Sequence, residues 1–493
     1  MAPFVNLSAT PYTSPVPSLN ARPQPRPHAP KHAPDATTAR PPENHIQNHI
    51  PLSALLNDTQ ALAPVFDVQS RDELSTSSRS SGFEPLPDGM SANRRLATGV
   101  DSLTVVRARG AYLWDRSNRR YTDYVCGLGT VLLGHANEDV NAAISAQLEL
   151  GVQIAATHQR EIDLADQLCD AMPGMDAVRL HIGSASAVQT ALRVARVATS
   201  RELVLRFAGH AHGHWAAGSS MVLPWNDAAA LETAFAEHGP SLAALIAEPV
   251  MSNYGGFEAA PGFFTLIRRL CSQHQTVFIL DESVTGLRLG LQGAIGKYLL
   301  TGNLGPDLMI CGQSLGNGAP IGALAGKAKL MELLVNHAVA HGNTFSGNSI
   351  GVAAGLALLA RLQIGGQGFY QRLTDRGRAL REGIEAIGRE TGVPLTVRGP
   401  GPMFWLDLDT PPAALPIFDL PPAESPAYRR FRHALLGKGV RVLRGGAWYL
   451  SDSHTDADIE ATLGSVRATL SATRAEPVVV GDDVTFIPDG PAR

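Results

Sequence analysis

The chain has 493 residues, of which 44% are hydrophobic and 17% are charged, a composition typical of soluble globular proteins rather than of fibrous or membrane proteins. Lys plus Arg (41) nearly equals Asp plus Glu (45), and no dense basic run occurs, which argues against a nucleic acid or an anionic membrane as partner. A small-molecule substrate and a cytoplasmic location are therefore expected, because the sequence shows no secretory signal either.

The first 80 residues differ in composition from the rest. Eleven prolines precede residue 43, and this density of proline, with few large apolar residues, predicts a disordered arm. A transit peptide is disfavoured because proline would break its amphipathic helix. The arm could instead bind a protein partner. Residues 50–56 could form a short docking helix, although a frayed turn is the better interpretation.

From about residue 100, short apolar runs alternate with helix-like segments. This alternation predicts an α/β fold with a mostly parallel central sheet, helices on both faces, and a ligand site at the carboxyl ends of the strands. The expected strands are 111–115, 120–124, 202–207, 242–248, 276–280, 308–311 and 403–406. The expected helices include 140–150 and 428–436. The cysteines should be reduced thiols, mostly in the core, because Cys126, Cys169, Cys271 and Cys311 lack metal-ligand spacing.

One strand ends in acids. The run 276–282 is apolar until it reaches Asp281 and Glu282, at the place where α/β sheets bind ligands. An acid there should meet a cationic partner, because an unpaired charge in a cleft is costly. Asp281 could equally well cap the following helix, since Asp is a common N-cap residue. The residues alone leave both roles open.

Four blocks carry a family resemblance. Residues 248–253, 281–288, 316–323 and 343–348 occur in the order and spacing of class III aminotransferases. The segments 86–91, 132–136 and 450–455 resemble the opening and closing segments of glutamate-1-semialdehyde aminomutase, so the resemblance points to that branch and covers roughly residues 85 to 470. It implies the type I fold of pyridoxal phosphate enzymes and a homodimer whose sites lie at the subunit interface.

The resemblance also implies a domain layout. A large cofactor domain would span residues 141–390, and a small α+β domain would be built from both chain ends, residues 81–140 and 391–471. The arm (1–80) and a tail (472–493) would lie outside both domains.

A site for pyridoxal 5′-phosphate or pyridoxamine 5′-phosphate follows from the same resemblance. Asp281 would keep the ring nitrogen protonated, the helix opening near Ser184 would hold the phosphate on its backbone N–H groups, and Thr344 would reach the partner subunit's phosphate. The cofactor-binding positions carried over are Ser184, Ala185, Ala211, His212, Glu248, Asn253, Asp281, Ser283 and Thr344. The catalytic positions are Asp281 and Gln313.

Three substitutions fall in this pocket. Gln313 stands where the family has the lysine that binds the cofactor covalently and moves the substrate proton, and an amide does neither. Loss of acid/base help alone costs on the order of 100- to 10,000-fold in rate. Ala211 replaces the aromatic that usually stacks on the ring, and residues 183–187 read Gly-Ser-Ala-Ser-Ala where the family has Ser-Gly-Thr-Glu-Ala. Cofactor binding would therefore be non-covalent and the chemistry altered.

Two further features have alternative interpretations. Lys327 and Lys329 could replace the missing lysine, but solvated surface cations are the better interpretation, because covalent chemistry needs accurate placement. His210, His212 and His214 form an HxHxH string that would face one way on a strand. Since the family has a histidine here without a metal, we expect no metal site.

Three functions remain in view. The favoured hypothesis is an aminotransferase- or aminomutase-like enzyme acting on a small amino or keto compound without the lysine cycle, either with unlinked cofactor or with a repurposed pocket. The second is a catalytically silent homologue that serves as a regulatory or heterodimer partner subunit. The third is an ordinary pyridoxal-phosphate-dependent aminotransferase. The order of the pocket's glycines and polar residues favours the first.

Overall fold

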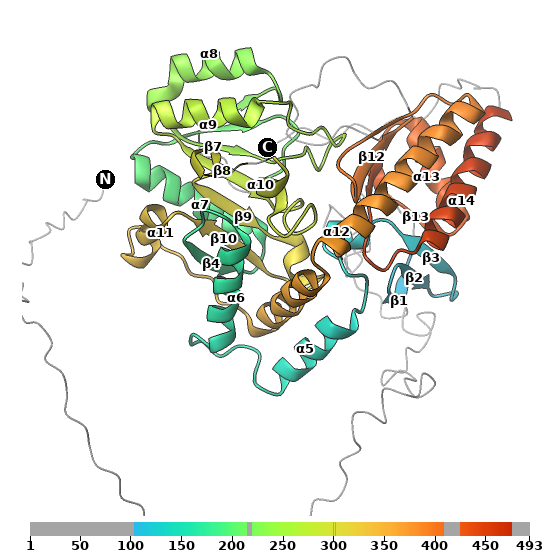
Figure 1. The fold of residues 1–493 in the computed structure, drawn as a ribbon, viewed down its shortest axis with the longest axis horizontal. Coiled ribbons are helices and arrows are strands. Elements are labelled where there is room, and N and C mark those ends of the chain that lie inside the picture. Colours follow the sequence, from blue (N-terminus) through green and yellow to red (C-terminus); the bar gives the residue numbers. More distant parts are fainter. Residues whose placement is uncertain (1–102, 214–218, 299, 301, 409–423, 476–493) are drawn as a thin grey trace, which may run out of the picture. The chain divides into compact units, whose positions relative to one another are not determined.

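The structure, a computed structural model, describes residues 103–213, 219–298, 300, 302–408 and 424–475 (Figure 1). All of these residues belong to one compact unit, Glu84–Arg493. The proline-rich arm, its segment 50–56 and most of the tail lie outside the described residues, so the expectations for them stay predictions. The predicted domain boundaries also stay predictions.

Seven strands form the large sheet (Figure 1). In spatial order they are β4 (Ala177–His181), β10 (Gly322–Gly326), β9 (Leu308–Cys311), β8 (Val277–Glu282), β7 (Leu242–Ala247), β5 (Leu203–Phe207) and β6 (Ser220–Leu223). The strands from β9 to β6 run parallel, whereas β10 is antiparallel to both β4 and β9. The predicted α/β fold with a mostly parallel sheet is confirmed.

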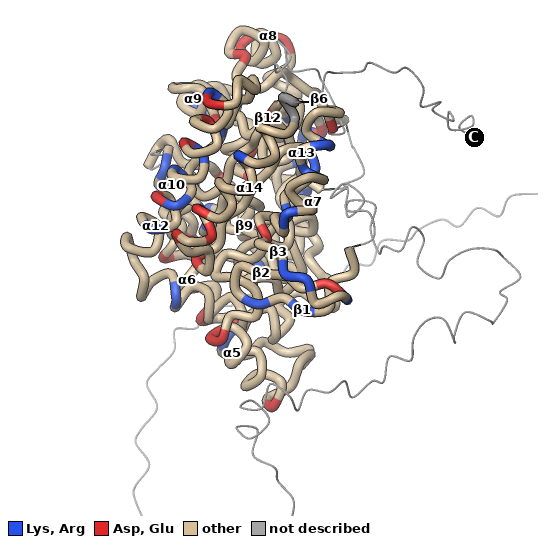
Figure 2. The backbone as a smooth tube through the Cα atoms, turned by 90° about the vertical axis from the view of Figure 1, so that its right-hand side faces the viewer, with Lys and Arg blue, Asp and Glu red and all other residues tan. Residues whose placement is uncertain are grey.

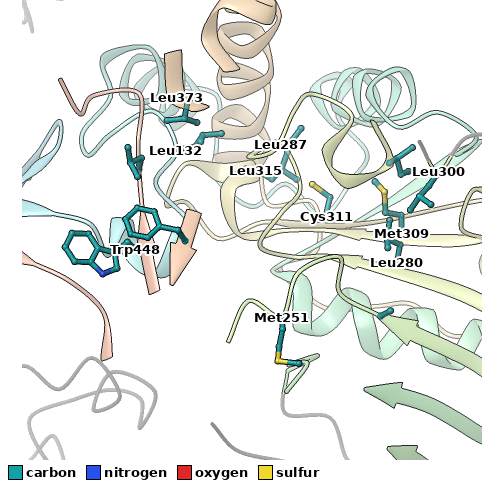
Figure 3. Close-up of a cluster of buried hydrophobic side chains, with 14 of the residues drawn as sticks. Leu132, Met251, Leu280, Leu287, Leu300, Met309, Cys311, Leu315, Leu373 and Trp448 are labelled. Atoms are coloured by element: carbon teal, nitrogen blue, oxygen red, sulfur yellow. The ribbon is translucent and has the colours of Figure 1, made fainter. Parts of the chain in front are cut away.

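Side chains of this sheet alternate between two cores. Along β8, Ile279 belongs to the core beneath α7, whereas Leu280 belongs to the core on the other face. Figure 3 shows part of that second core around Leu280 and Met309. Because side chains alternate along a strand, Asp281 points to the α7 face and Glu282 to the opposite face.

Helices cover both faces of the sheet. They are α5 (Glu138–Leu148), α6 (Gln159–Ala171), α7 (Ser184–Thr199), α8 (Ala228–His238), α9 (Phe263–His274), α10 (Gly293–Lys297) and α11 (Ala328–Val335). Helix α7 packs against β4, β10, β9, β8 and β7, and α9 packs against β8. The first turn of α5 is capped by Asn137, whose side chain accepts the N–H of Val140, an arrangement that stabilises a helix start.

The sequence pattern does not predict β10. Its run, Gly-Ala-Leu-Ala-Gly, has one large side chain, so its apolar signal is weak. All five residues are nevertheless buried, and a Cβ on Gly326 would lie 2.5 Å from the Leu308 side chain. Because β10 is antiparallel, Gly322 pairs with His181 at the carboxyl edge of the sheet, and Gly326 pairs with Ala177 at the opposite edge.

Two smaller sheets are built from segments near both ends of the described chain. The four-stranded sheet contains β1 (Val105–Arg109), β2 (Tyr112–Asp115), β3 (Arg120–Asp123) and β13 (Val440–Arg441). The three-stranded sheet contains β11 (Thr396–Arg398), β12 (Met403–Asp407) and β14 (Ala447–Tyr449). The accompanying helices are α4 (Cys126–Gly129), α13 (Pro426–Gly437) and α14 (Asp456–Ala475). Parallel pairing of β13 with β3 joins the two segments in one sheet.

Helix α12 (Ser349–Thr391) links these regions (Figure 1). It contacts α5 and α6 near the large sheet and α14, β11 and β12 near the small ones. Gly366, with φ 49° and ψ −144°, interrupts it, and Gly392 with φ 72° ends it, as expected of a left-handed C-cap. By length and composition alone α12 could cross a membrane, but half of its most apolar window is buried in the protein, so this is weak evidence.

Candidate active site at the carboxyl edge of the sheet

The start of α7 is pressed against the ends of two strands. A Cβ added to Gly312, which follows β9, would lie 2.6 Å from the Ser184 Cβ, and one added to Gly322 would lie 2.7 Å from the Ser184 backbone nitrogen. Across from them, a Cβ on Gly213 would lie 2.8 Å from the Ala185 Cβ. Three glycines, two from loops and one from the start of β10, therefore allow their backbones to pack closely around the first turn of α7.

This first turn is suited to an anion. Helix α7 has 16 residues, and its N-cap, Gly183, provides no side-chain cap. The N–H of Ala187 already bonds to the Gly183 carbonyl at 3.3 Å, which leaves the N–H groups of Ser184 and Ala185 at the helix end. Backbone donors and the helix dipole together favour an anion at such a site.

Asp281 ends the neighbouring part of the sheet and is held by partners on both oxygens. Its Oδ2 lies 2.7 Å from His212 Nδ1, and its Oδ1 accepts the backbone N–H of Ser283 at 3.0 Å and the Ser283 hydroxyl at 2.5 Å. Asp281 and His212 are 1% and 4% exposed. The carboxylate therefore has a defined orientation, and the helix-capping role is not the one observed, because Ser283 lies in a turn.

The segment after β5 is fastened to the end of β7. The Glu248 carboxylate accepts the Ala211 N–H at 2.5 Å and the Ser252 N–H at 3.3 Å, and the Ser252 hydroxyl also donates to it. Burial raises the pKa of Glu248 to about 7, with a further contribution from the nearby Asp281 carboxylate. Glu248 therefore fixes the loop that carries His212.

Gln313 lies at the same edge as Asp281. It begins the short 3₁₀ helix Gln313–Gly316 directly after β9, and Asp281 pairs with Ile310 in the adjoining strand, so Gln313 and Asp281 lie on the order of 10 Å apart. The Gln313 amide oxygen is buried and has no hydrogen-bond partner among the described residues. This position offers the site an amide, which donates and accepts hydrogen bonds but carries no amine.

Two lysines lie at the far edge of the sheet. Lys327 and Lys329 follow Gly326, which places them roughly 17 Å along β10 from Gly322. Lys327 Nζ forms an ion pair with Asp307 Oδ1 at 2.7 Å, and Lys329 is exposed. This geometry favours their interpretation as surface cations over a role in the pocket.

The whole chain has five lysines. Besides those two, Lys297 in α10 binds Glu258 at 2.6 Å, and Tyr298 donates to the same carboxylate at 2.8 Å. Lys438 is exposed at the end of α13, in the small-sheet region, and Lys31 lies outside the described residues. Among the described lysines, none follows β9 beside Ser184.

The other predicted positions have different surroundings. Asn253 is part-buried, and its amide lies 3.4 Å from the Ser252 hydroxyl in the loop after β7. Thr344 is exposed, and its carbonyl accepts the Gln153 amide at 2.5 Å. The structure therefore brings the positions at 184–185, 211–212, 248–253, 281–283 and 313 to one edge, whereas the role of Thr344 toward a partner subunit stays a prediction.

The histidine string is not a strand. His210 and His212 lie in the irregular segment after β5, with ring centroids 6.0 Å apart, and His214 lies outside the described residues. His210 Nδ1 accepts the Glu248 N–H at 3.0 Å, and burial lowers the pKa of His210 well below its usual value. Within the described ranges, no group of three or more His, Cys, Asp or Glu side chains could hold a metal ion.

Sequence reasoning overlooks His181. It ends β4, is 1% exposed, and its Nδ1 lies 2.8 Å from the Ser186 hydroxyl on α7. Its ring lies 4.4 Å from that of His341, and burial lowers the pKa of His181 to about 3, with a further contribution from His341. β4 reads Ala-Val-Arg-Leu-His and is only partly buried, so His181 does not stand out from an apolar run as Asp281 does, and the sequence pattern gives little signal for it.

The donor set fits one kind of ligand. A buried, oriented carboxylate suits a protonated ring nitrogen, and the uncapped first turn of α7 suits a phosphate. The three close-approaching glycines surround that turn with backbone rather than with side chains. The residues present therefore fit pyridoxal phosphate or pyridoxamine phosphate.

Comparisons with known proteins agree with this geometry. The sequence profile described as Aminotransferase class-III matches residues 96–224 and 220–451. An omega-transaminase from Sphaerobacter thermophilus is 27% identical with a TM-score of 0.71, and the match covers 79% of this chain and 95% of that chain. A beta-phenylalanine aminotransferase from Variovorax paradoxus is 27% identical with a TM-score of 0.69, covering 76% and 88%.

A third similar structure supports the fold alone. The glutamate-1-semialdehyde aminomutase from Pseudomonas aeruginosa PAO1 is 22% identical with a TM-score of 0.67, and the match covers 77% of this chain and 90% of that chain. A lysine-to-alanine variant of that enzyme has been solved in complex with PMP.

Proposed function

Because the chain belongs to the class III aminotransferases, with their type I pyridoxal phosphate fold, we propose that it is an aminotransferase- or aminomutase-like enzyme that holds its cofactor without a lysine link. Its substrate would be a small amino or keto compound. Membership of the aminomutase branch stays part of this proposal, because aminotransferases of other specificities are at least as similar.

One observation carries the proposal. Gln313 follows β9 next to the start of α7, at the edge that holds Asp281, and the described lysines lie elsewhere or are bound to acids. The anchoring carboxylate and the anion site are therefore both present where an amine is missing. That combination supports binding without a covalent bond.

The cofactor's ring, when bound, serves as an electron sink for charge that develops on the substrate carbon. Asp281 would hold a proton on the ring nitrogen, and His212 and Ser283 would keep its two oxygens aligned for that hydrogen bond. The N–H groups of Ser184 and Ala185 would bind the phosphate. Glu248 would keep the His212 loop in place through the Ala211 N–H.

Gln313 would orient rather than react. Its amide could hydrogen-bond to the cofactor or substrate but would supply no proton near neutral pH. The missing acid/base group accounts for a loss on the order of 100- to 10,000-fold in rate, so proton transfer would have to use water or the substrate. Slow turnover is therefore part of the proposal.

We also propose a homodimer. The segment after α5 exposes Leu150 (64%), Val152 (39%) and Ile154 (45%), and Phe345 beside Thr344 is 52% exposed. These two segments are in contact, because the Asn348 amide donates to the Val152 carbonyl at 3.3 Å. Apolar side chains gathered around Thr344 support burial by a second copy, and sedimentation of the purified chain tests this.

The function is tested with pyridoxamine phosphate as the probe. The full chain is mixed with it, dialysed, and then treated with a panel of 2-keto acids, while bound cofactor is followed by absorbance and new amino acids by chromatography. The proposal predicts retained cofactor and one amino acid formed per cofactor. The matched variant Gln313→Glu, which keeps the size of the side chain but adds an unpaired charge, should retain less cofactor.

Two other results would contradict the proposal. Retained cofactor with no amino acid from any keto acid would indicate a catalytically silent partner subunit. No retention at all would indicate a pocket turned to other chemistry.

A further inference from the structure

The exposed face of the four-stranded sheet, which contains β1, β2, β3 and β13, is rich in arginine and aromatic side chains. The register places Arg107 of β1 opposite Trp114 of β2, which in turn lies opposite Arg120 of β3. The Arg107 guanidinium lies 3.9 Å from the centre of the Trp114 ring, and the Arg120 guanidinium lies 4.5 Å from the Tyr112 ring. Both arginines are exposed. We name these four residues the arginine face.

Further cations border this face. Arg116 lies in the exposed turn after β2. Lys438 lies just before β13, and the carbonyl of the next residue, Gly439, accepts the N–H of Thr122 in β3. Figure 2 shows basic positions recurring along β1, β2, β3 and α13 on the side turned to the viewer. The chain as a whole has a net charge of −4, so this excess of positive charge is local.

These cations have few acids to neutralise them. Within the described part of the chain, Arg107, Arg116, Arg120 and Lys438 form no ion pair. Three acids in or beside this sheet have other partners. The Asp458 carboxylate accepts the Tyr112 hydroxyl at 2.6 Å, Asp115 accepts the Tyr121 hydroxyl at 2.7 Å, and Glu138 pairs with Arg109. Arg107 and Arg120 therefore present guanidinium groups to solvent without an ion-pair partner among the described residues.

An apolar edge adjoins the charges. Val105 and Val106 of β1 are 40% and 62% exposed. β1 pairs only with β2 in the sheet order, so its outer edge has no strand partner among the described residues. Val105 pairs with Asp115, on the opposite face from Trp114, whereas Val106 lies at the register shift beside Arg107. The exposed aliphatic side chains therefore flank the outer edge of β1, next to the arginine face.

We propose that the arginine face and the Val105–Val106 edge dock a folded protein whose surface presents carboxylates beside apolar side chains. Arg, Trp and Tyr are the residues enriched at the centres of protein interfaces, where Lys is depleted. Between residues 103 and 123 the chain has five arginines and no lysine. Stacking on Trp114 and Tyr112 holds the guanidinium groups in place, so binding them to carboxylates costs little conformational entropy.

A designed peptide tests this surface. The probe is a fluorescein-labelled amphipathic peptide with glutamates on one face and leucines on the other, and binding to the full chain is followed by fluorescence anisotropy. Binding is expected to weaken on the order of tenfold in the double variant Arg107→Glu and Arg120→Glu. Val105→Ser with Val106→Ser should weaken it without changing its salt dependence, because those side chains are uncharged.

The matched control reverses two exposed arginines elsewhere. Arg193→Glu with Arg389→Glu changes the net charge equally and should leave the affinity unchanged, because both arginines are exposed and lie outside the arginine face. Equal losses in both double variants would overturn the proposal. Tighter binding of a single-stranded oligonucleotide, or of phosphatidylserine vesicles, than of the peptide would overturn it too and would assign the face to nucleic acid or membrane. If thermal unfolding shows that the double glutamate variant folds poorly, the double variant Arg107→Ala and Arg120→Ala is tested in its place.

Discussion

The ends of β8 and β9 are neighbours in the sheet, yet their polar residues have different surroundings. Asp281 has hydrogen-bond partners on both carboxylate oxygens, from His212 and Ser283. Gln313 has a buried amide oxygen without a described partner. The difference teaches that two polar residues at one edge of the sheet depend on separate neighbours, so the support of Asp281 does not require any partner of Gln313.

The largest expected effect comes from placing an amine at position 313. Gln313→Lys should yield a covalent adduct with pyridoxal phosphate after borohydride reduction, and should raise amino transfer on the order of 100- to 10,000-fold. The measurement is the intact mass together with the rate. A Gln313→Met control has similar length without an amine and should give neither. No adduct in the lysine variant would show that position 313 does not face the cofactor.

The second largest effect should come from removing the Asp281 carboxylate. Asp281→Asn leaves His212 beside an amide, which lowers the free energy of unfolding by about 2 kcal/mol. It should also weaken the binding of pyridoxamine phosphate on the order of 100-fold, because a charge-assisted hydrogen bond is lost. Calorimetric titration and denaturant unfolding measure the two effects. Unchanged affinity in a folded variant would place the cofactor elsewhere.

The opposite face of β8 offers a carboxylate with fewer partners. Glu282 Oε2 accepts the Ala294 N–H at 2.7 Å and the Thr285 hydroxyl at 3.1 Å, whereas Oε1 has no described partner. Glu282 also lines a cavity of about 10 Å³, barely enough for one water. Burial raises the pKa of Glu282 to about 7. The pKa of Glu282 is therefore higher in the folded than in the unfolded protein. The free energy of unfolding falls as the pH rises from the ordinary pKa of 4.5 through about 7.

Glu282→Gln should remove that pH dependence. Relative to the unaltered chain, the variant should gain up to about 3 kcal/mol in the free energy of unfolding between pH 4.5 and pH 8. Denaturant unfolding at several pH values gives the difference directly. A difference that stays constant with pH would show that Glu282 is already ionised in the folded protein.

The smallest effect concerns two histidines with different partners. His212 Nδ1 meets a carboxylate, whereas His181 Nδ1 meets only the Ser186 hydroxyl, and burial lowers the pKa of His181 to about 3. A lowered histidine pKa means that stability is lost as pH falls below 6.5. His181→Gln should reduce this loss by about 1 kcal/mol between pH 6.5 and 5.5. An unaltered slope in unfolding experiments would mean that His181 titrates normally.

Much of the fold could be predicted from local pattern. The runs that form β7, β8 and β9 are buried throughout and apolar up to the acids that end β8, whereas Arg206 interrupts the apolar run of β5. β10 could not be predicted in this way, because its small residues carry little hydrophobic signal and its antiparallel direction is set by tertiary packing. Helix α12 is interrupted at Gly366, and the pair Gly365-Gly366 is the sequence signal for that kink.

The contacts of the site lie beyond local pattern. His212 and Asp281 are 69 residues apart in sequence, and His181 meets His341 across 160 positions, so no periodicity connects them. The arginine face likewise combines three strands. Resemblance supplied the position of Gln313, but only the structure shows that the described lysines are placed or paired elsewhere.

The most direct test of the lysine-free site is borohydride reduction of the unaltered full chain after saturation with pyridoxal phosphate and dialysis, followed by intact mass and peptide mapping. The account predicts that cofactor is retained, that the mass stays that of the polypeptide, and that denaturation releases the cofactor. A stoichiometric adduct mapped to one lysine, with Lys297 and Lys31 the first to inspect, would contradict it and restore the ordinary aminotransferase mechanism.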